Sequence, residues 1–248
     1  MVRAIASNYA ALAAQAAWLV VLTPFLAAQR GADELGAWTL AMAIAGFLAL
    51  LDIGIGATVA RFVAADVGGA RRSELVSSAF AVMCAVALVA AAAGVGLAVA
   101  ARSVFASGTD VGLAIAVAVL GSALQLPLRI FSHLLYGLER IVERNAFTVA
   151  RLVLSLAATI AGVLAGWALP AYLALALGAE VLLAGAQALW AMRGPAGVTL
   201  RPRLVKRATV GELTRFGIPT FGLQAATQIV YYSDAVVVGA SLGTARAG

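Results

Sequence analysis

One long apolar stretch constrains this chain more than any other feature. Residues 35–60 form a run of 26 residues in which Asp52 is the only charged side chain. At ~1.5 Å per residue, a helix of this length exceeds the ~30 Å hydrocarbon core of a bilayer. Over the whole chain 63% of residues are hydrophobic and 11% are charged, whereas soluble domains have about 25% charged residues. The sequence therefore predicts an all-α, polytopic integral membrane helix bundle.

Further apolar runs bring the prediction to about seven transmembrane helices. They cover residues 9–28, 35–60, 75–101, 111–136, 146–166, 169–192 and 213–239. The longest loop, residues 193–212, is too short for a soluble domain, since domains begin near ~50 residues. A weak repeat relates the segment after Gln15 to the segment after Gln224, although two apolar segments also match by chance. We therefore predict one six-helix lobe over residues 1–212 and the first helix of a truncated second lobe over 213–248.

Positive charges predict how the chain lies in the membrane. The N-terminus and the alternate loops that follow it hold 11 Lys and Arg residues, whereas the other loops hold three. Because basic residues collect in cytoplasmic loops, we expect a cytoplasmic N-terminus. The same loops account for the net charge of +6, so no nucleic-acid partner is expected. One cysteine and one histidine cannot form a zinc site, and neither a metal nor a cofactor is predicted.

Polar side chains recur at helical spacing in two of the predicted membrane helices. One stripe consists of Ser122, Gln125, Arg129, His133 and Tyr136, and the other of Thr148, Arg151, Ser155 and Thr159. Residues three or four apart share one face of a helix, and Arg129 and Arg151 fall at similar depth. Guanidinium groups suit phosphate, so the pair predicts a site for a ligand that carries phosphate groups. The alternative is that both arginines extend to the interface or pair with Glu180 or Asp52.

Other polar residues extend the candidate site. Arg61, Gln125, His133, Gln15 and Gln224 are predicted to line the same substrate cavity. Glutamines also form hydrogen bonds that only hold membrane helices together, and the sequence does not separate the two roles. Three acids lie deep in predicted helices, namely Asp52, Glu180 and Asp234. Each is a candidate for binding a proton or a sodium ion, or for structural pairing with the arginines.

Several short motifs resemble those of a known family. They lie in the first predicted helix, with Asn8, Gln15 and Pro24, and at residues 35–38, 51–56, 60–64, 200–204, 213–217 and 232–239. With them the chain is similar to the polysaccharide-transporter branch of the multidrug/oligosaccharidyl-lipid/polysaccharide flippase superfamily, which includes O-antigen and capsule flippase-like proteins. The resemblance implies two six-helix lobes, of which this chain holds the N-terminal half. It also implies the flipping of a polyprenyl-pyrophosphate-linked oligosaccharide across a bacterial cytoplasmic (inner) membrane by alternating access. In such a protein Arg129 and Arg151 would hold the lipid pyrophosphate.

Three other functions are compatible with the residues. A cation-coupled multidrug antiporter of the same superfamily would depend on the deep acids more than on the arginines. An integral membrane glycosyltransferase would need clustered Asp, His or Arg beside the membrane, whereas these loops hold scattered basic residues. A scaffold would act in a complex with a polysaccharide polymerase. Because no nucleophile and base can be paired, we predict a transporter and not an enzyme, with the bilayer and a lipid-linked oligosaccharide as partners.

Overall fold

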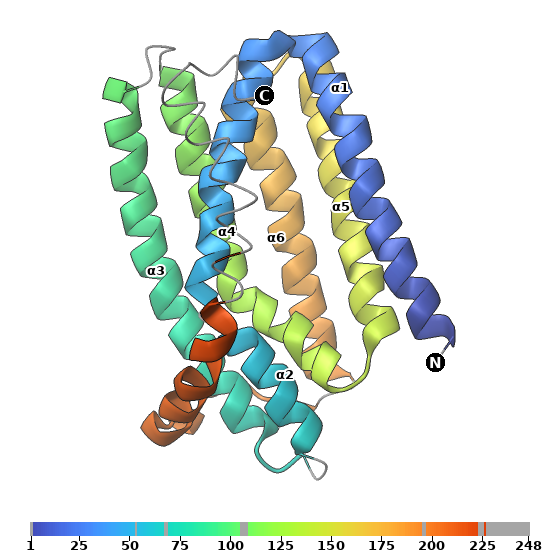
Figure 1. Cartoon of the computed structure of the whole chain (residues 1–248), viewed down its shortest axis with the longest axis vertical. Helices are drawn as coiled ribbons and strands as arrows, with labels where there is room; N and C mark the ends of the chain where they lie inside the picture. The colour runs from blue at the N-terminus through green and yellow to red at the C-terminus, as the bar shows by residue number, and fades with distance from the viewer. Residues whose placement is uncertain are drawn as a thin grey trace.

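Long helices dominate the computed structural model, which describes residues 2–52, 54–66, 69–104, 109–194, 197–222 and 226 (Figure 1). In chain order they are α1 (Val2–Gly46), the 3-10 helix η1 (Phe47–Asp52), α2 (Ile55–Ala65), α3 (Arg72–Val104), α4 (Thr109–Gly137), α5 (Ile141–Leu164), α6 (Leu169–Arg193) and the 3-10 helix η2 (Pro202–Leu204). Within the described residues, five helices are long and apolar enough to cross a membrane. The predicted all-α polytopic membrane bundle is confirmed.

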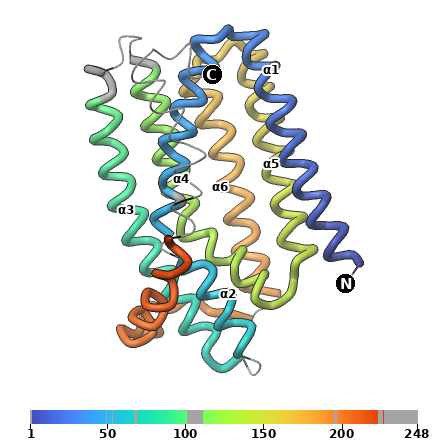
Figure 2. The backbone as a smooth tube through the Cα atoms, viewed as in Figure 1, coloured from blue at the N-terminus to red at the C-terminus, as the bar shows by residue number. Residues whose placement is uncertain are grey.

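Helix α1 contains the first predicted helix and the start of the second. Residues 29–34, which the sequence predicted as a loop, are helical except at Gly31, where φ is 80° and ψ is 176°. Glycine adopts a positive φ at little steric cost because it has no Cβ. Figures 1 and 2 show the chain reversing in this region, so that α1 consists of two antiparallel arms. The predicted loop is therefore replaced by a helical reversal.

An arginine fastens this reversal to the rest of the bundle. Nη2 of Arg30 donates hydrogen bonds to the carbonyl oxygens of Val163 (2.9 Å) and Trp167 (2.8 Å). The last carbonyls of a helix have no partner within that helix, so the guanidinium satisfies groups at the end of α5. Arg30 Nε also lies 3.7 Å from Glu34 Oε1. The turn of α1 is thus tied to the connection between α5 and α6.

The predicted helix 35–60 is broken at Asp52. The α-helix ends at Gly46, η1 follows, and α2 begins after Gly54, which has the left-handed φ of 69°. The Asp52 carboxylate accepts a hydrogen bond from the backbone N–H of Gly56 at 3.1 Å. This N–H is one of the free donors at the start of α2. The prediction of one continuous helix with Asp52 in its middle was therefore wrong, and Asp52 lies at a helix break.

Glycines allow α2 to pack directly on α4. A side-chain carbon at Gly56 would lie 2.3 Å from His133 Nε2, and one at Gly137 would lie 2.4 Å from the carbonyl oxygen of Ala60. Neither position has room for a Cβ. The short helix α2 and its Arg61 are thereby held against the end of α4, at the end of the bundle opposite the reversal of α1 (Figure 1).

Two apolar clusters hold the long helices together. One joins α1, α3, α4, α5 and α6 and reaches Leu126 on α4, and the other joins α2, α3, α4 and α6 and begins on α4 at Ile130. Within a bilayer these contacts stabilise by close packing, because lipid tails are as apolar as the side chains. Gln125 and Arg129 immediately precede Leu126 and Ile130 in the sequence. The polar residues of α4 therefore lie level with the junction between the two clusters.

The basic loop after α6 is bound to α3. We name residues 197–206 the strap. Its backbone N–H groups at Thr199, Arg201 and Lys206 donate to the side-chain oxygens of three serines near the start of α3, Ser73 (3.2 Å), Ser77 (3.3 Å) and Ser78 (3.3 Å). Ser77 Oγ also donates to the carbonyl oxygen of Thr199 at 3.3 Å. The strap therefore follows the first turns of α3.

A further helix, residues 207–222, continues from the strap. It begins before residue 213, where the sequence predicted the seventh helix, and residues 223–225 and 227–239 of that prediction lie outside the described residues. Arg71 Nη2 lies 3.0 Å from Glu212 Oε2. The hydrogen bond to this carboxylate raises the pKa of Arg71. The division into lobes at residue 212 stays a prediction, and the start of this helix is fixed to α3.

The basic segments gather at one end of the bundle. Figure 1 shows the N-terminus, α2, the connection between α4 and α5 and the strap region at the end opposite the reversal of α1. These are the segments whose Lys and Arg residues outnumber those of the other loops. This arrangement agrees with the count of basic residues in alternate loops, from which the cytoplasmic N-terminus is predicted. The side of the membrane that this end faces stays a prediction.

Candidate functional site

Three adjoining pockets lie among α1, α2, α4, α5 and α6. The central pocket, of about 340 Å³, is lined by Gln15, Gln125, Arg129, Ser132, His133, Arg144, Thr148, Arg151, Leu152 and Glu180. The basal pocket, of about 870 Å³, lies between α2, α4 and α5, and the side pocket, of about 380 Å³, lies between α1 and α5. Arg144 lines all three pockets. They are neighbours that share their walls.

The central pocket gathers six of the ten predicted site residues. They are Gln15, Gln125, Arg129, His133, Arg151 and Glu180. Gln15 comes from α1, Glu180 from α6, and the others from the polar stripes of α4 and α5. The two stripes that the sequence predicted therefore line one pocket, and residues more than 100 positions apart join them there.

Positive charge prevails in the central pocket. Arg129, Arg144 and Arg151 line it, and among its described lining residues Glu180 is the one carboxylate. Glu180 Oε2 accepts a hydrogen bond from Gln125 Nε2 at 3.3 Å. Charges interact more strongly in a medium of low dielectric constant than in water, so three guanidinium groups here favour a bound anion.

One donor in this pocket lacks a partner. Nε of Arg151 is buried and makes no hydrogen bond within the described part of the chain. A buried donor without a partner costs about 1–3 kcal/mol, and more when the group is charged. The side chain nevertheless lines a pocket, where an acceptor from a ligand or from water can reach it. Arg151 is therefore placed to bind a molecule that brings oxygen atoms.

Arg144 is a site residue that was not predicted, because the fifth helix was expected to begin at residue 146. Helix α5 begins at Ile141, so Arg144 lies in its first turn and shares a face with Thr148 and Arg151. Nε of Arg144 donates to Ser132 Oγ at 3.1 Å, and its guanidinium carbon lies 5.4 Å from the centre of the Tyr136 ring. The sequence pattern that identifies Arg144 is the stripe of α5, because Arg144 lies four residues before Thr148.

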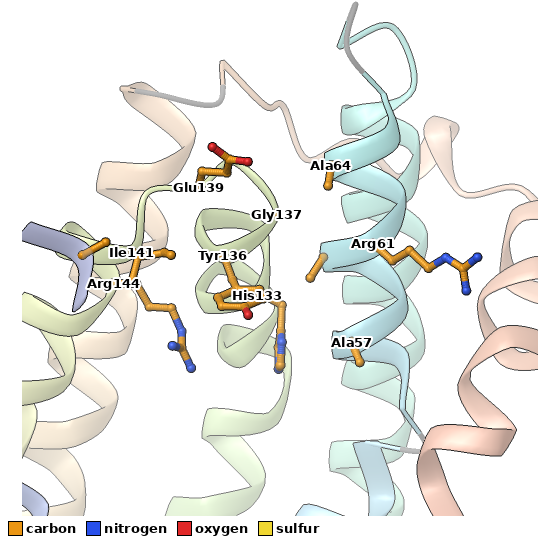
Figure 3. A pocket seen from close by; sticks show the side chains of 11 residues that line it. Ala57, Arg61, Ala64, His133, Tyr136, Gly137, Glu139, Ile141 and Arg144 are labelled. Atoms are coloured by element: carbon orange, nitrogen blue, oxygen red, sulfur yellow. The ribbon is translucent and has the colours of Figure 1, made fainter. Parts of the chain in front are cut away.

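Arg61 lines the basal pocket and not the central one. Figure 3 shows it on α2 with its side chain directed away from His133 and Arg144. Its guanidinium carbon lies 5.5 Å from the centre of the Phe216 ring, in helix 207–222, which is a cation–π contact. Arg61 therefore shares the basal pocket with Arg144 but does not line the central pocket with Arg129 and Arg151. His133 lines both pockets.

The remaining predicted site residues lie elsewhere. Asp52 accepts its hydrogen bond at the start of α2 and is not among the residues that line the three pockets. Gln224 and Asp234 lie outside the described residues. Among the described residues, no group of three or more His, Cys, Asp or Glu side chains is placed to hold a metal ion. Of the three deep acids, Glu180 is the one that the structure places at the arginine cluster.

Two solved transporters have a similar fold. The first is a MOP superfamily transporter from Pyrococcus furiosus, described as having a binding pocket of reverse polarity that suggests a different function. The TM-score is 0.63 and the sequence identity 18%, and the match covers 98% of this chain and 55% of that transporter. The second is a multidrug resistance MATE family transporter of the MOP superfamily in an inward-facing conformation, with a TM-score of 0.59, 18% identity and coverage of 88% and 52%. The chain spans about half the length of either transporter.

The family of this protein follows from a sequence match over almost the whole chain. A comparison with curated proteins finds no match. The family described as polysaccharide biosynthesis protein matches residues 4–248. This match confirms the resemblance to polysaccharide transporters that the short motifs indicated. The chain belongs to the polysaccharide biosynthesis protein family.

Proposed function

We propose that this protein is a membrane transporter that flips a polyprenyl-pyrophosphate-linked oligosaccharide across the bacterial cytoplasmic membrane by alternating access. The observation that carries the proposal is the convergence of Arg129, Arg144 and Arg151 on the central pocket, where Glu180 is the one carboxylate among the described lining residues. The family name and the transporter fold of the similar structures support it.

Pyrophosphate suits these arginines. It carries several negative charges and many acceptor oxygens, and a planar guanidinium can donate two parallel hydrogen bonds to such a group. The buried Nε of Arg151, which makes no hydrogen bond within the described chain, gains an acceptor when a phosphoryl oxygen binds. The predicted pair Arg129 and Arg151 thereby becomes a group of three with Arg144.

The neighbouring pockets suit the sugars. Asn8, Gln15, Asn145 and Thr148 line the side pocket, and their amides and hydroxyl can donate to and accept from sugar hydroxyl groups. The basal pocket adds a volume of about 870 Å³ beside the central pocket. A head group bound by the arginines therefore has polar groups beside it in the side pocket and further space in the basal pocket.

Access to the pockets fits a substrate that comes from the cytoplasmic leaflet. The basal pocket lies at the end of the bundle where the basic segments gather (Figure 1). With the N-terminus in the cytoplasm, as the charge count predicts, this end faces the leaflet in which such lipids are made. In this proposal residues 1–212 form one lobe, and 213–248 begin the second lobe, against which the first one moves.

A second candidate function is a cation-coupled multidrug antiporter. Glu180 lines the central pocket, and one of the similar structures is a multidrug resistance transporter. In this function Glu180 exchanges a cation, and the arginines are less important. A single carboxylate beside three arginines binds a cation poorly, so the arginine cluster favours the anionic substrate.

The two functions differ in one complementation experiment. Source cells that lack the gene receive the wild type, a triple variant Arg129→Ala, Arg144→Ala and Arg151→Ala, or Glu180→Gln, at equal membrane levels. We expect lipid-linked oligosaccharide to accumulate with the triple variant, while the matched control Arg203→Ala, an exposed residue of the strap, restores export. Full export by the triple variant would overturn the flippase. Unchanged lipid-linked sugars with a drug sensitivity that depends on Glu180 would establish the antiporter.

A further inference from the structure

An apolar groove follows the exposed face of α5. It has a volume of about 740 Å³ and is lined by eight residues of α5 between Val142 and Ala157, by Ser7 and Ala10 of α1 and by Leu183 of α6. Except for Ser7 and Asn145, every residue in this lining is apolar. Val153 is 60% exposed. The groove therefore lies on the outside of the described bundle, where a transmembrane helix meets lipid.

The dimensions of the groove suit an extended hydrocarbon chain. From Val142 to Ala157, α5 covers about 22 Å, since a helix rises ~1.5 Å per residue, and this is a large part of the ~30 Å hydrocarbon core. Ala146 and Ala150, one helical turn apart, leave the space that larger side chains would fill. A single apolar chain can lie along this length without meeting a charged group of the lining.

One end of the groove meets the polar pockets. Asn145 lines both the groove and the side pocket and is only 4% exposed. Its Nδ2 donates to Asn8 Oδ1 (2.6 Å) and to Ser7 Oγ (3.0 Å) on α1. Arg144, the residue before Asn145, lines the central pocket. A cationic pocket and an apolar groove thus meet within one turn of α5.

We propose that this groove binds the polyprenyl chain of the lipid whose pyrophosphate lies in the central pocket. The inference rests on the proposed function and adds a second binding surface to it. Arg144, Thr148 and Arg151 present one side of α5 to the head group, and Ala146, Ala150 and their neighbours present another side to the chain. This juxtaposition matches a molecule with an anionic head and a long apolar tail.

The expected contribution of the groove is modest. Lipid tails are as apolar as the groove, so the chain gains from its fit to the surface and not from leaving water. Filling the groove should therefore weaken binding about three- to tenfold, which is the scale of one core packing contact. The effect should depend on chain length, because a short chain does not reach the groove.

The test compares two pyrophosphates that share a head and differ in their tail. The affinities of undecaprenyl pyrophosphate and dimethylallyl pyrophosphate are measured with the full-length protein of the source cell, in nanodiscs of one lipid composition. Ala150→Phe fills the groove. The matched control, Ala161→Phe, places the same side chain at an exposed position of α5 outside the groove.

The expected result is that Ala150→Phe weakens the binding of undecaprenyl pyrophosphate about three- to tenfold and leaves the binding of dimethylallyl pyrophosphate unchanged. Retained binding of the short probe also shows that the variant is folded. Equal affinity of wild type and Ala150→Phe for the long probe, or equal weakening by Ala161→Phe, would overturn the groove and leave the proposed function in place. If the wild type binds neither pyrophosphate, both inferences fall.

A second measurement avoids substitutions altogether. Undecaprenyl pyrophosphate with a diazirine in its chain is bound to the wild type, irradiated, and the labelled peptides are identified by mass spectrometry. We expect label on residues 142–157, reduced by an excess of the unmodified lipid. Label spread equally over the exposed apolar residues of α3, such as Leu88 and Val89, would show contact with lipid in general and would overturn the proposal.

Discussion

Gly54 lies directly against the backbone of Gly217. A side-chain carbon at Gly54 would be 2.3 Å from the carbonyl oxygen of Gly217. Gly54 precedes α2, just after the helix break at Asp52, and Gly217 belongs to helix 207–222, which follows the strap. Two segments separated by more than 150 residues are therefore in contact at a point where neither has a side chain.

Gly54→Ala should destabilise the protein by about 2 kcal/mol or more. The substitution adds the clash with Gly217 to the cost of about 1–2 kcal/mol for a side chain at positive φ. The midpoint of thermal unfolding in detergent measures the change. The control Gly178→Ala adds the same methyl group to α6, where no described atom lies within 4 Å, and should unfold at or slightly above the temperature of the wild type, because alanine favours a helix more than glycine does. An unfolding midpoint of Gly54→Ala equal to that of Gly178→Ala would contradict the contact.

Arg151→Ala should weaken binding of a soluble pyrophosphate by about tenfold or more. Hydrogen bonds to charged groups contribute about 1.5–3 kcal/mol, and Arg151 brings a buried donor that has no other partner within the described chain. Arg151→Lys should restore only part of the affinity, because an ammonium group cannot form the planar paired contact. Isothermal titration calorimetry gives both dissociation constants. Identical affinities of wild type and Arg151→Ala would remove this residue from the binding site.

Asn145→Leu should loosen the first arm of α1. The variant removes the hydrogen bonds to Asn8 and Ser7, and in membrane proteins such bonds contribute about 0.6 kcal/mol each on average. We expect faster amide hydrogen exchange in residues 2–28 than in the wild type. In the control Thr39→Ala, the lost hydroxyl bonds, within the described residues, to the Leu35 carbonyl of its own helix, and exchange in residues 2–28 should not change. Unchanged exchange in Asn145→Leu would show that packing alone holds α1 on α5.

Ser77→Ala should release the strap from α3. Ser77 Oγ accepts from the backbone N–H of Arg201 and donates to the carbonyl oxygen of Thr199, so one substitution removes two of the contacts. Arg203 and Lys206 are exposed and offer trypsin cleavage sites, whereas Pro202 prevents cleavage after Arg201. Limited proteolysis should cut the strap of this variant several times faster than that of the wild type. Ser155→Ala, a buried serine of α5, serves as control, and equal cleavage rates for all three proteins would contradict the role of Ser77.

The class of fold and much of the site can be predicted from the sequence alone. Long apolar runs with few charges have no stable alternative to membrane-spanning helices, because every backbone polar group must be paired within the bilayer. Polar residues three and four positions apart must share a helix face, so the stripes with Arg129 and Arg151 could be identified without coordinates. The family motifs likewise depend only on local order along the chain, and the family match confirms them.

Which stripes share a pocket and where the helices bend depend on contacts between segments that lie far apart in the sequence. Gln15 and Glu180 join the arginines because α1 and α6 pack around α4 and α5, and no local pattern encodes that packing. The break at Asp52 and the reversal at Gly31 place helices against partners far away in sequence, at Gly217 and at Val163. A long apolar run predicts that a segment forms a helix within a membrane. Its bends and its neighbours follow from contacts between side chains and backbone that lie distant along the chain.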